Sequence, residues 1–242
     1  MKPTEEQTSV VETEAPILVV RAFAGTGKTS TLVEFAKRRN QKRMLYIVFS
    51  KQNQKDAEKK FKGTMVKPTT SHALAFRYTG VPYKDQLITG LKPYQVEKAL
   101  GISRELSCEV GYRSGYNNDM MVSSVVIESL IKFLYSVDKE IQAKHVHENH
   151  KRLEKFFSQM DENAIKQMIV IKTKKLWAKM IDPRDMDVGM LHDGYLKLYQ
   201  LSEPDLPEYE YHLIDESQDL NPVTLSIIFR QSGKKVFVGD SH

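Results

Sequence analysis

Residues 17–30 read ILVVRAFAGTGKTS: an apolar run, a turn that contains two glycines, and then Lys28 and Thr29. The apolar run predicts a buried parallel strand, and the residues from Thr29 onward predict a helix. Glycines let such a turn aim successive backbone N–H groups at one point, where the positive end of the helix dipole also lies. The stretch therefore predicts a cradle for phosphate groups.

The spacing of the loop residues matches a Walker A motif in its expected setting, after a strand and before a helix. Lys28 would reach the β- and γ-phosphates of a nucleotide, and the hydroxyl of Thr29 would bind Mg²⁺. The usual pattern begins with Gly, whereas Ala22 stands there in this sequence. The alternative is a flexible turn without a ligand, which the flanking strand and helix disfavour. The predicted nucleotide-binding residues of the loop are Ala24, Gly25, Thr26, Gly27, Lys28, Thr29 and Ser30.

Strands and helices alternate at both ends of the chain. We expect strands at 17–20, 44–49, 65–67, 209–214 and 235–238, and helices at 29–39, 53–61, 71–78 and 222–229. This alternation predicts an α/β fold with a parallel sheet that is covered on both faces.

The middle of the chain has a different pattern. Between residues 79 and 186 no buried strand is indicated, and helical periodicity dominates. A helical insertion is therefore predicted, with a loop at 112–118. Its expected helices lie at 123–135, 151–160 and 164–179.

Composition restricts the class of protein. Of the 242 residues, 40% are hydrophobic and 28% are charged, as is usual for globular domains. No apolar run approaches the roughly 18–20 residues of a membrane helix, and the polar, acidic N-terminus is not a signal peptide. A single cysteine, Cys108, excludes an intramolecular disulfide and fits a reducing compartment, the cytosol or the nucleus. The net charge of +5 mildly favours a polyanionic partner such as nucleic acid.

Two carboxylates, Asp215 and Glu216, follow the apolar run at 209–214. A carboxylate at a strand end can hold the Mg²⁺ that Thr29 binds, and we assign this role to Asp215. Its neighbour Glu216 would orient and deprotonate the attacking water. Taken alone, such residues are more often part of a solvated loop. Together with the phosphate cradle, and with Lys28 as the third catalytic residue, they predict a nucleotide hydrolase.

Several segments resemble the UvrD/Rep/PcrA group of superfamily 1 DNA helicases. DESQD at 215–219 is similar to their Walker B box, and AFAGTGKT at 22–29 has their form of the loop. Gln7 stands where that family has its adenine-reading glutamine. The closest likeness is to the F-box DNA helicase branch, although no F-box segment is visible. It rests on SHALAF at 71–76, HDGYLKL at 192–198 and VGDSH at 238–242.

The resemblance implies a RecA-like P-loop NTPase sheet, domain 1A, interrupted by a helical domain 1B. Domain 1A would occupy residues 1–79 and 187–242, and domain 1B residues 80–186. A second RecA-like domain, 2A, would supply an arginine finger, and the γ-phosphate-sensing glutamine would follow His242. The chain is then expected to be the ATP-binding half of a 3′–5′ helicase that uses ATP and Mg²⁺. It would bind nucleotide weakly and hydrolyse it slowly without domain 2A.

The resemblance also implies contacts with single-stranded DNA and with single-strand/double-strand junctions. Segments 46–56 and 70–74 are similar to the DNA-contacting motifs Ia and Ib, and 236–240 resembles the start of motif III. The ring of Phe49 could stack on a base or belong to the core. His72 could contact DNA or cap its helix. The other candidate donors to DNA phosphates are Ser50, Lys51, Asn53, Thr70 and Ser71.

Other interpretations stay open. An ATP-dependent DNA-binding switch, or a motor subunit of a nuclease or defence system, would use the same residues, and Gln7 with DESQD disfavours a small-molecule kinase. A role in DNA repair or recombination is expected from the resemblance alone. Basic helical surface is the preferred interpretation of His145, His147 and His150, rather than a metal site. Lys172, Lys174 and Lys175 beside Trp177 predict a solvated helix face with one buried Trp, or alternatively a contact with duplex DNA.

Overall fold

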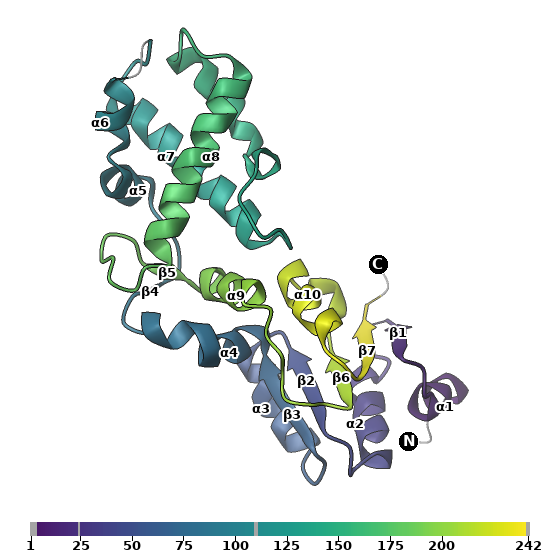
Figure 1. Cartoon of the computed structure of the whole chain (residues 1–242). Coiled ribbons are helices and arrows are strands. Elements are labelled where there is room, and N and C mark those ends of the chain that lie inside the picture. The colour runs from purple at the N-terminus through teal and green to yellow at the C-terminus, as the bar shows by residue number, and fades with distance from the viewer. Residues whose placement is uncertain (1–3, 24, 109–110, 241–242) are drawn as a thin grey trace. The chain divides into compact units, whose positions relative to one another are not determined.

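The computed structural model describes residues 4–23, 25–108 and 111–240 (Figure 1). The chain divides into two compact units. The first consists of Met1–Ala75 and Glu203–His242, and the second of Phe76–Ser202. Within the part of the chain that is described, no helix has both the length and the apolar character needed to cross a membrane.

A five-stranded parallel sheet forms the centre of the first unit. Its strands are β1 (Ile17–Arg21), β2 (Met44–Val48), β3 (Val66–Thr70), β6 (Tyr211–Ile214) and β7 (Lys234–Gly239), in the order β1-β7-β6-β2-β3. Every residue of β2 and β6 is buried, as expected for central parallel strands with helices on both faces. The predicted α/β class with a parallel sheet is confirmed.

Helices cover both faces of this sheet. They are α1 (Glu5–Glu12), α2 (Lys28–Arg38), α3 (Lys51–Lys60), α4 (Ser71–Ala75), η5 (Ser217–Asp219) and α10 (Pro222–Arg230). Phe35 of α2 is fully buried in a core with Tyr46 and Leu213, and each such side chain contributes about 1.5–3 kcal/mol. On the opposite face, Phe237 stacks on Phe229 of α10 at 5.4 Å between ring centres.

The first strand differs from its prediction, because β1 is only half buried. Leu18 and Val20 pack against the core, whereas Ile17 and Val19 on the other face are 51% and 58% exposed. Among the described residues β1 pairs only with β7, so it is an edge strand. An apolar run alone does not distinguish an edge strand from a central one.

The second unit is mainly helical. Its α-helices are α5 (Pro93–Leu100), α6 (Ile102–Ser107), α7 (Tyr116–Leu134), α8 (Glu162–Met180) and α9 (His192–Leu201). The helices α7 and α8 pack against each other, and Leu130 and Ile169 are fully buried. The shorter elements are η1 (Phe76–Gly80), η2 (Val81–Tyr83), β4 (Leu87–Ile88), η3 (Ala143–His145), η4 (Glu148–Phe156) and β5 (Met190–Leu191).

Several boundaries in this unit depart from the sequence-based expectation. Between 79 and 186 the described residues include a short strand, β4, which pairs with β5 and is half-buried rather than buried. Two residues are too few to give a periodic signal. The expected loop at 112–118 ends early because α7 begins at Tyr116, and the expected helix at 151–160 is the 3-10 helix η4. Residues 187–202 belong to the helical unit, where α9 packs against η1. The assignment of the two units to domains 1A and 1B stays a prediction.

Two of the three clustered histidines of the second unit do not belong to the expected basic surface. His145 and His150 are buried, and their Nε2 atoms lie 2.8 Å from a carboxylate oxygen of Asp138 and 3.0 Å from one of Glu162. Each ring thus has its own acidic partner, which periodicity could not indicate.

The lysine-rich face of α8 also differs from its prediction. Lys172 is buried and forms an ion pair with Glu105, which Lys175 also contacts at 3.0 Å. Trp177 is half-buried. Only part of this face is therefore solvated.

Candidate nucleotide site

The loop between β1 and α2 has the backbone conformation that its glycines predicted. Gly25 and Gly27 have φ angles of +79° and +84°, a region that residues with a side chain rarely adopt. Gly27 caps α2 without any side-chain hydrogen bond, so the first N–H groups of the helix are not occupied by a capping side chain. Such a helix N-terminus attracts anions. Ala24 lies outside the described residues.

Lys28 begins α2 and forms an ion pair with Asp240, at the end of β7. The hydrogen bond with Asp240 raises the pKa of Lys28, and the nearby charges of Glu216 and Asp215 act in the same direction. The lysine is therefore a firmly protonated cation beside the loop. Asp240 was part of the segment that resembles motif III, yet no role was predicted for it. The sequence feature that could have indicated Asp240 was its position after an apolar strand.

The two predicted magnesium ligands lie in contact with each other. The Thr29 hydroxyl donates a hydrogen bond to Oδ2 of Asp215 at 3.2 Å. The backbone N–H of Glu216 donates to the other oxygen, Oδ1, at 3.1 Å. A hydroxyl and a carboxylate are the kinds of oxygen donor that Mg²⁺ prefers. Among the described residues, no three His, Cys, Asp or Glu side chains gather as metal ligands.

Tyr46 is a site residue that sequence reasoning missed. Its phenol also donates to Oδ2 of Asp215. Burial, followed by the charge of Asp215, raises the pKa of Tyr46 far above its ordinary value, so the phenol stays protonated. The pairing of β2 with β6 places Tyr46 beside Leu213 and thereby close to the acidic strand end. This contact joins residues 169 positions apart, and no local pattern indicates it.

Glu216 has a strained backbone, with φ at +49°, in the left-handed region. Its carboxylate accepts a hydrogen bond from Nε2 of Gln218 at 2.9 Å. Glu216, Asp215, Thr29 and Tyr46 line a cavity of about 160 Å³, together with residues of α3 that include Asn53. The predicted general base thus borders the same cavity as the predicted metal ligands.

Gln7 lies on α1 and reaches the phosphate loop. Its Nε2 donates to the carbonyl oxygen of Thr26 at 3.0 Å. The Gln7 side chain also accepts from the backbone N–H of Thr4, which completes a capping box at the start of α1. A second cavity, of about 630 Å³, lies between α1, β1 and the loop, and Gln7, Val10 and Leu18 are among its lining residues. Its partly apolar wall suits a nucleotide base.

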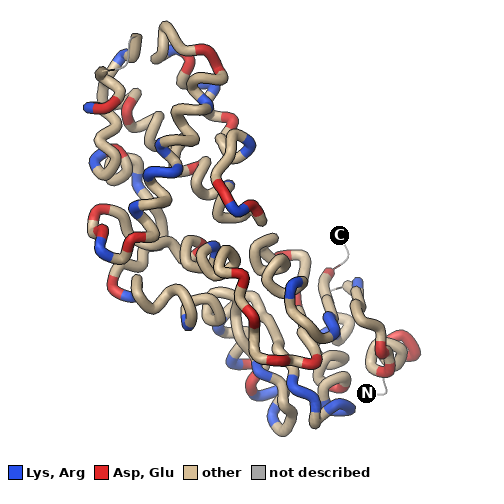
Figure 2. The backbone as a smooth tube through the Cα atoms, in the orientation of Figure 1, with Lys and Arg blue, Asp and Glu red and all other residues tan. Residues whose placement is uncertain are grey.

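The predicted DNA-contacting residues differ in their accessibility. Phe49 is 67% exposed, so it does not belong to the core, and Lys51 is exposed as well. Ser50 accepts a hydrogen bond from the backbone of Asn53 and caps α3. That helix carries four lysines and two acidic residues (Figure 2).

The segment that resembles motif Ib is less accessible. Thr70 is buried, and its hydroxyl oxygen accepts from the backbone N–H of Ala73. Ser71 and His72 are half-buried. Thr70 therefore makes the cap on this helix. Contact with DNA stays a prediction for all the candidate residues of the two segments.

Comparison with known proteins agrees with the geometry of the site. The AAA domain family matches residues 6–242. F-box DNA helicase protein 1 of Schizosaccharomyces pombe is 32% identical over 252 residues, which cover 99% of this chain and 27% of that protein. F-box DNA helicase 1 of Gallus gallus is 32% identical over 256 residues, 100% of this chain and 24% of that protein. The chain spans about a quarter of the length of these relatives. It therefore belongs to the AAA domain family, within the superfamily 1 helicase group that its motifs resemble.

Proposed function

We propose that this chain is the ATP-binding part of an ATP-dependent DNA helicase or translocase. The observation that carries the proposal is the contact of Thr29 with Asp215, which brings the phosphate loop to the two carboxylates at the end of β6. Phosphoryl transfer needs mainly positioning and charge neutralisation, and this set of residues supplies both. The two F-box DNA helicase relatives, which share this whole segment, support DNA as the partner.

In the proposed mechanism the loop N–H groups and Lys28 hold the phosphates of ATP. Lys28 would exchange its contact with Asp240 for phosphate oxygens. Thr29 and Asp215 would hold Mg²⁺, which supplies positive charge to the developing transition state. Glu216 would orient the attacking water and accept its proton. Gln7 would read the adenine beside the loop. Full turnover would also need an arginine from a second RecA-like domain, as the resemblance implies.

Single-stranded DNA is the proposed track. The exposed ring of Phe49 is available to stack on a base, which contributes about 1–3 kcal/mol per base without regard to sequence. Lys51 and the other lysines of α3 would attract the DNA phosphates. Movement in the 3′–5′ direction, action at single-strand/double-strand junctions and a role in DNA repair or recombination belong to this proposal.

The test is steady-state ATP hydrolysis by the full-length protein, with and without a single-stranded oligonucleotide, and with Lys28→Ala as the blank. We expect strong stimulation by DNA that is lost in the variant. Nucleotide binding without DNA stimulation would contradict a DNA-dependent motor. That result would instead favour a nucleotide-dependent switch.

A further inference from the structure

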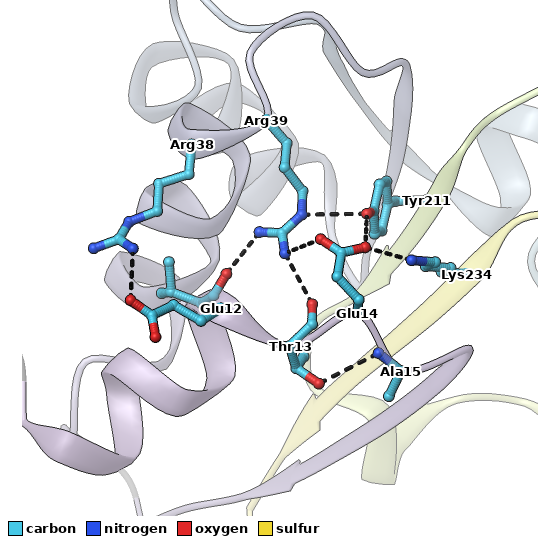
Figure 3. Close-up of polar contacts among 9 residues, drawn as sticks. Glu12, Thr13, Glu14, Ala15, Arg38, Arg39, Tyr211 and Lys234 are labelled. Atoms are coloured by element: carbon cyan, nitrogen blue, oxygen red, sulfur yellow. Dashed lines mark hydrogen bonds and ion pairs between the residues drawn. The ribbon is translucent and has the colours of Figure 1, made fainter.

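Arg39 follows the last residue of α2 and connects that helix to the end of α1 (Figure 3). Its guanidinium donates to the carbonyl oxygens of Val11 at 2.6 Å and Thr13 at 2.8 Å. It also donates to Oε1 of Glu14 at 2.7 Å and to the hydroxyl of Tyr211 at 3.2 Å. One side chain thus fixes the three residues where α1 ends and the chain turns toward β1.

The surroundings of Arg39 make this connection rigid. The Arg39 side chain is only 10% exposed, and its guanidinium carbon lies 4.0 Å from the centre of the Phe35 ring. A buried guanidinium is stable only when its donors are bonded, so these contacts depend on one another. The planar fork of arginine can serve several acceptors at once, which a lysine cannot do in the same geometry.

Glu14 extends the cluster to the sheet (Figure 3). Its carboxylate accepts from the Tyr211 hydroxyl of β6 at 3.1 Å and forms an ion pair with Lys234 of β7. Lys234 first, and then Arg39, lower the pKa of Glu14 to about 2. The segment after α1 is therefore tied to two neighbouring strands as well as to α2.

The opposite end of α1 carries Gln7, whose side chain donates to Thr26 in the phosphate loop. Val11 is the one described residue of α1 that is fully buried, so apolar packing holds this helix weakly. The neighbouring Arg38 contributes little, because its pair with Glu12 joins side chains that are 46% and 60% exposed. The position of Gln7 relative to the loop therefore depends largely on Arg39.

We propose that Arg39 is a positioning residue that holds Gln7 at the base side of the nucleotide site and thereby sets selectivity for adenine nucleotides. Arg39 itself is not placed to contact the nucleotide, since its partners lie at the far end of α1. This inference rests on the proposed ATP site. It adds a residue that determines which base the site accepts.

The experiment compares Arg39→Ala with Arg38→Ala, which removes the adjacent arginine as a matched control. Calorimetry in the presence of Mg²⁺ gives the affinities for ATP, GTP and inorganic tripolyphosphate. We expect Arg39→Ala to reduce the preference for ATP over GTP by about five- to tenfold, the equivalent of one hydrogen bond. The affinity for tripolyphosphate should stay within about twofold, because the loop itself is unchanged. Arg38→Ala should keep the preference of the unsubstituted chain.

Several outcomes would overturn the proposal. One is an unchanged ratio of ATP affinity to GTP affinity in Arg39→Ala. Another is an equal loss of affinity for ATP and for tripolyphosphate, because a purely structural role affects both ligands alike. Should Arg39→Ala not fold, Glu14→Gln loosens the same cluster at an exposed residue and should reduce the ratio in part. An unsubstituted chain that binds no ATP in a Lys28-dependent way would instead overturn the proposed function itself.

Discussion

One lysine in each unit illustrates a different way of holding a cation. In the α/β unit, Lys28 is neutralised by the side chain of Asp240, a partner that an incoming phosphate can replace. In the helical unit, Lys197 is fully buried and donates to the carbonyl oxygens of Ser136 and Asp138 and to the Gln200 side chain. Two of these three acceptors are backbone atoms. The Lys28 cation can therefore take part in binding, whereas the Lys197 cation, held mainly by backbone acceptors, stabilises the fold.

The largest effect is expected at Glu216. Replacement by Gln keeps the size of the side chain but removes the group that accepts the proton, so ATP hydrolysis should fall by about 10²–10⁴-fold. ATP affinity should be almost unchanged, because Lys28 and the loop remain. Steady-state hydrolysis by the full-length protein and calorimetric binding would measure the two quantities. Asp219→Asn, on η5 after the same strand, serves as the control. Hydrolysis within a few-fold of the unsubstituted protein would assign the base to another residue.

Lys197 should affect stability and leave the nucleotide site unchanged. Lys197→Met removes the donor from three partly buried acceptors, which should lower the free energy of unfolding by about 3 kcal/mol. Trp177 is the single tryptophan of the chain, and its ring lies 5.7 Å from that of Phe133, so its fluorescence reports on this unit during denaturation. Lys174→Met, at an exposed position of α8, is the matched control. Equal stability of the two variants would show that the acceptors find other donors.

The part of the site that follows from local sequence was predictable, and the part made by strand pairing was not. Gly25 and Gly27 were expected to shape the loop because only glycine adopts those φ angles readily. Asp215 was expected because a carboxylate after a buried strand lies at the ligand-binding edge of a parallel sheet. Tyr46 and Asp240 come to the same edge through the pairing of β2 with β6 and of β6 with β7. That strand order cannot be read from any one segment.

The fold shows the same division. The strands and helices of the α/β unit were largely expected from their apolar patterns. The exposure of Val19 depends on whether another element covers β1, which its own pattern cannot tell. The buried His145 gave no signal either, because its partner Asp138 lies in a non-helical segment after α7. Residues 187–202 pack with the helical unit through a tertiary contact of α9 with η1, which their own pattern does not indicate.

The buried histidines of the two units also differ in their surroundings. His212, on β6, is buried beside Lys235 of the neighbouring strand, and burial first and then that charge lower the pKa of His212 to about 4. The unfolded chain binds this proton near pH 6.5, so the stability present above that pH is lost as the pH falls toward 4. A loss of up to about 3 kcal/mol is expected from a difference of this size.

Chemical denaturation followed by circular dichroism between pH 7 and pH 4 would measure this loss. His212→Val removes the titrating group and suits a strand, so its stability should vary less with pH over this range. His145 and His150 differ from His212, because each ring lies within hydrogen-bond distance of a carboxylate oxygen. An identical pH dependence in His212→Val would place the sensitivity elsewhere.

The smallest effect is expected at Asp240. It tests whether phosphate can replace Asp240 as the partner of Lys28, as the comparison of Lys28 with Lys197 assumes. Asp240→Asn removes the charge that competes with phosphate for Lys28, so ATP should bind about two- to fivefold more tightly. The gain is small because the Asp240 side chain is 26% exposed and water screens the pair. Calorimetry at fixed Mg²⁺ would measure the change in ATP affinity. In a chain that also carries Lys28→Ala, Asp240→Asn should give no gain in affinity, since the ion pair that it removes is already absent. Weaker ATP binding by Asp240→Asn would mean that this carboxylate assists the nucleotide, by water-mediated contact with Mg²⁺, instead of opposing it.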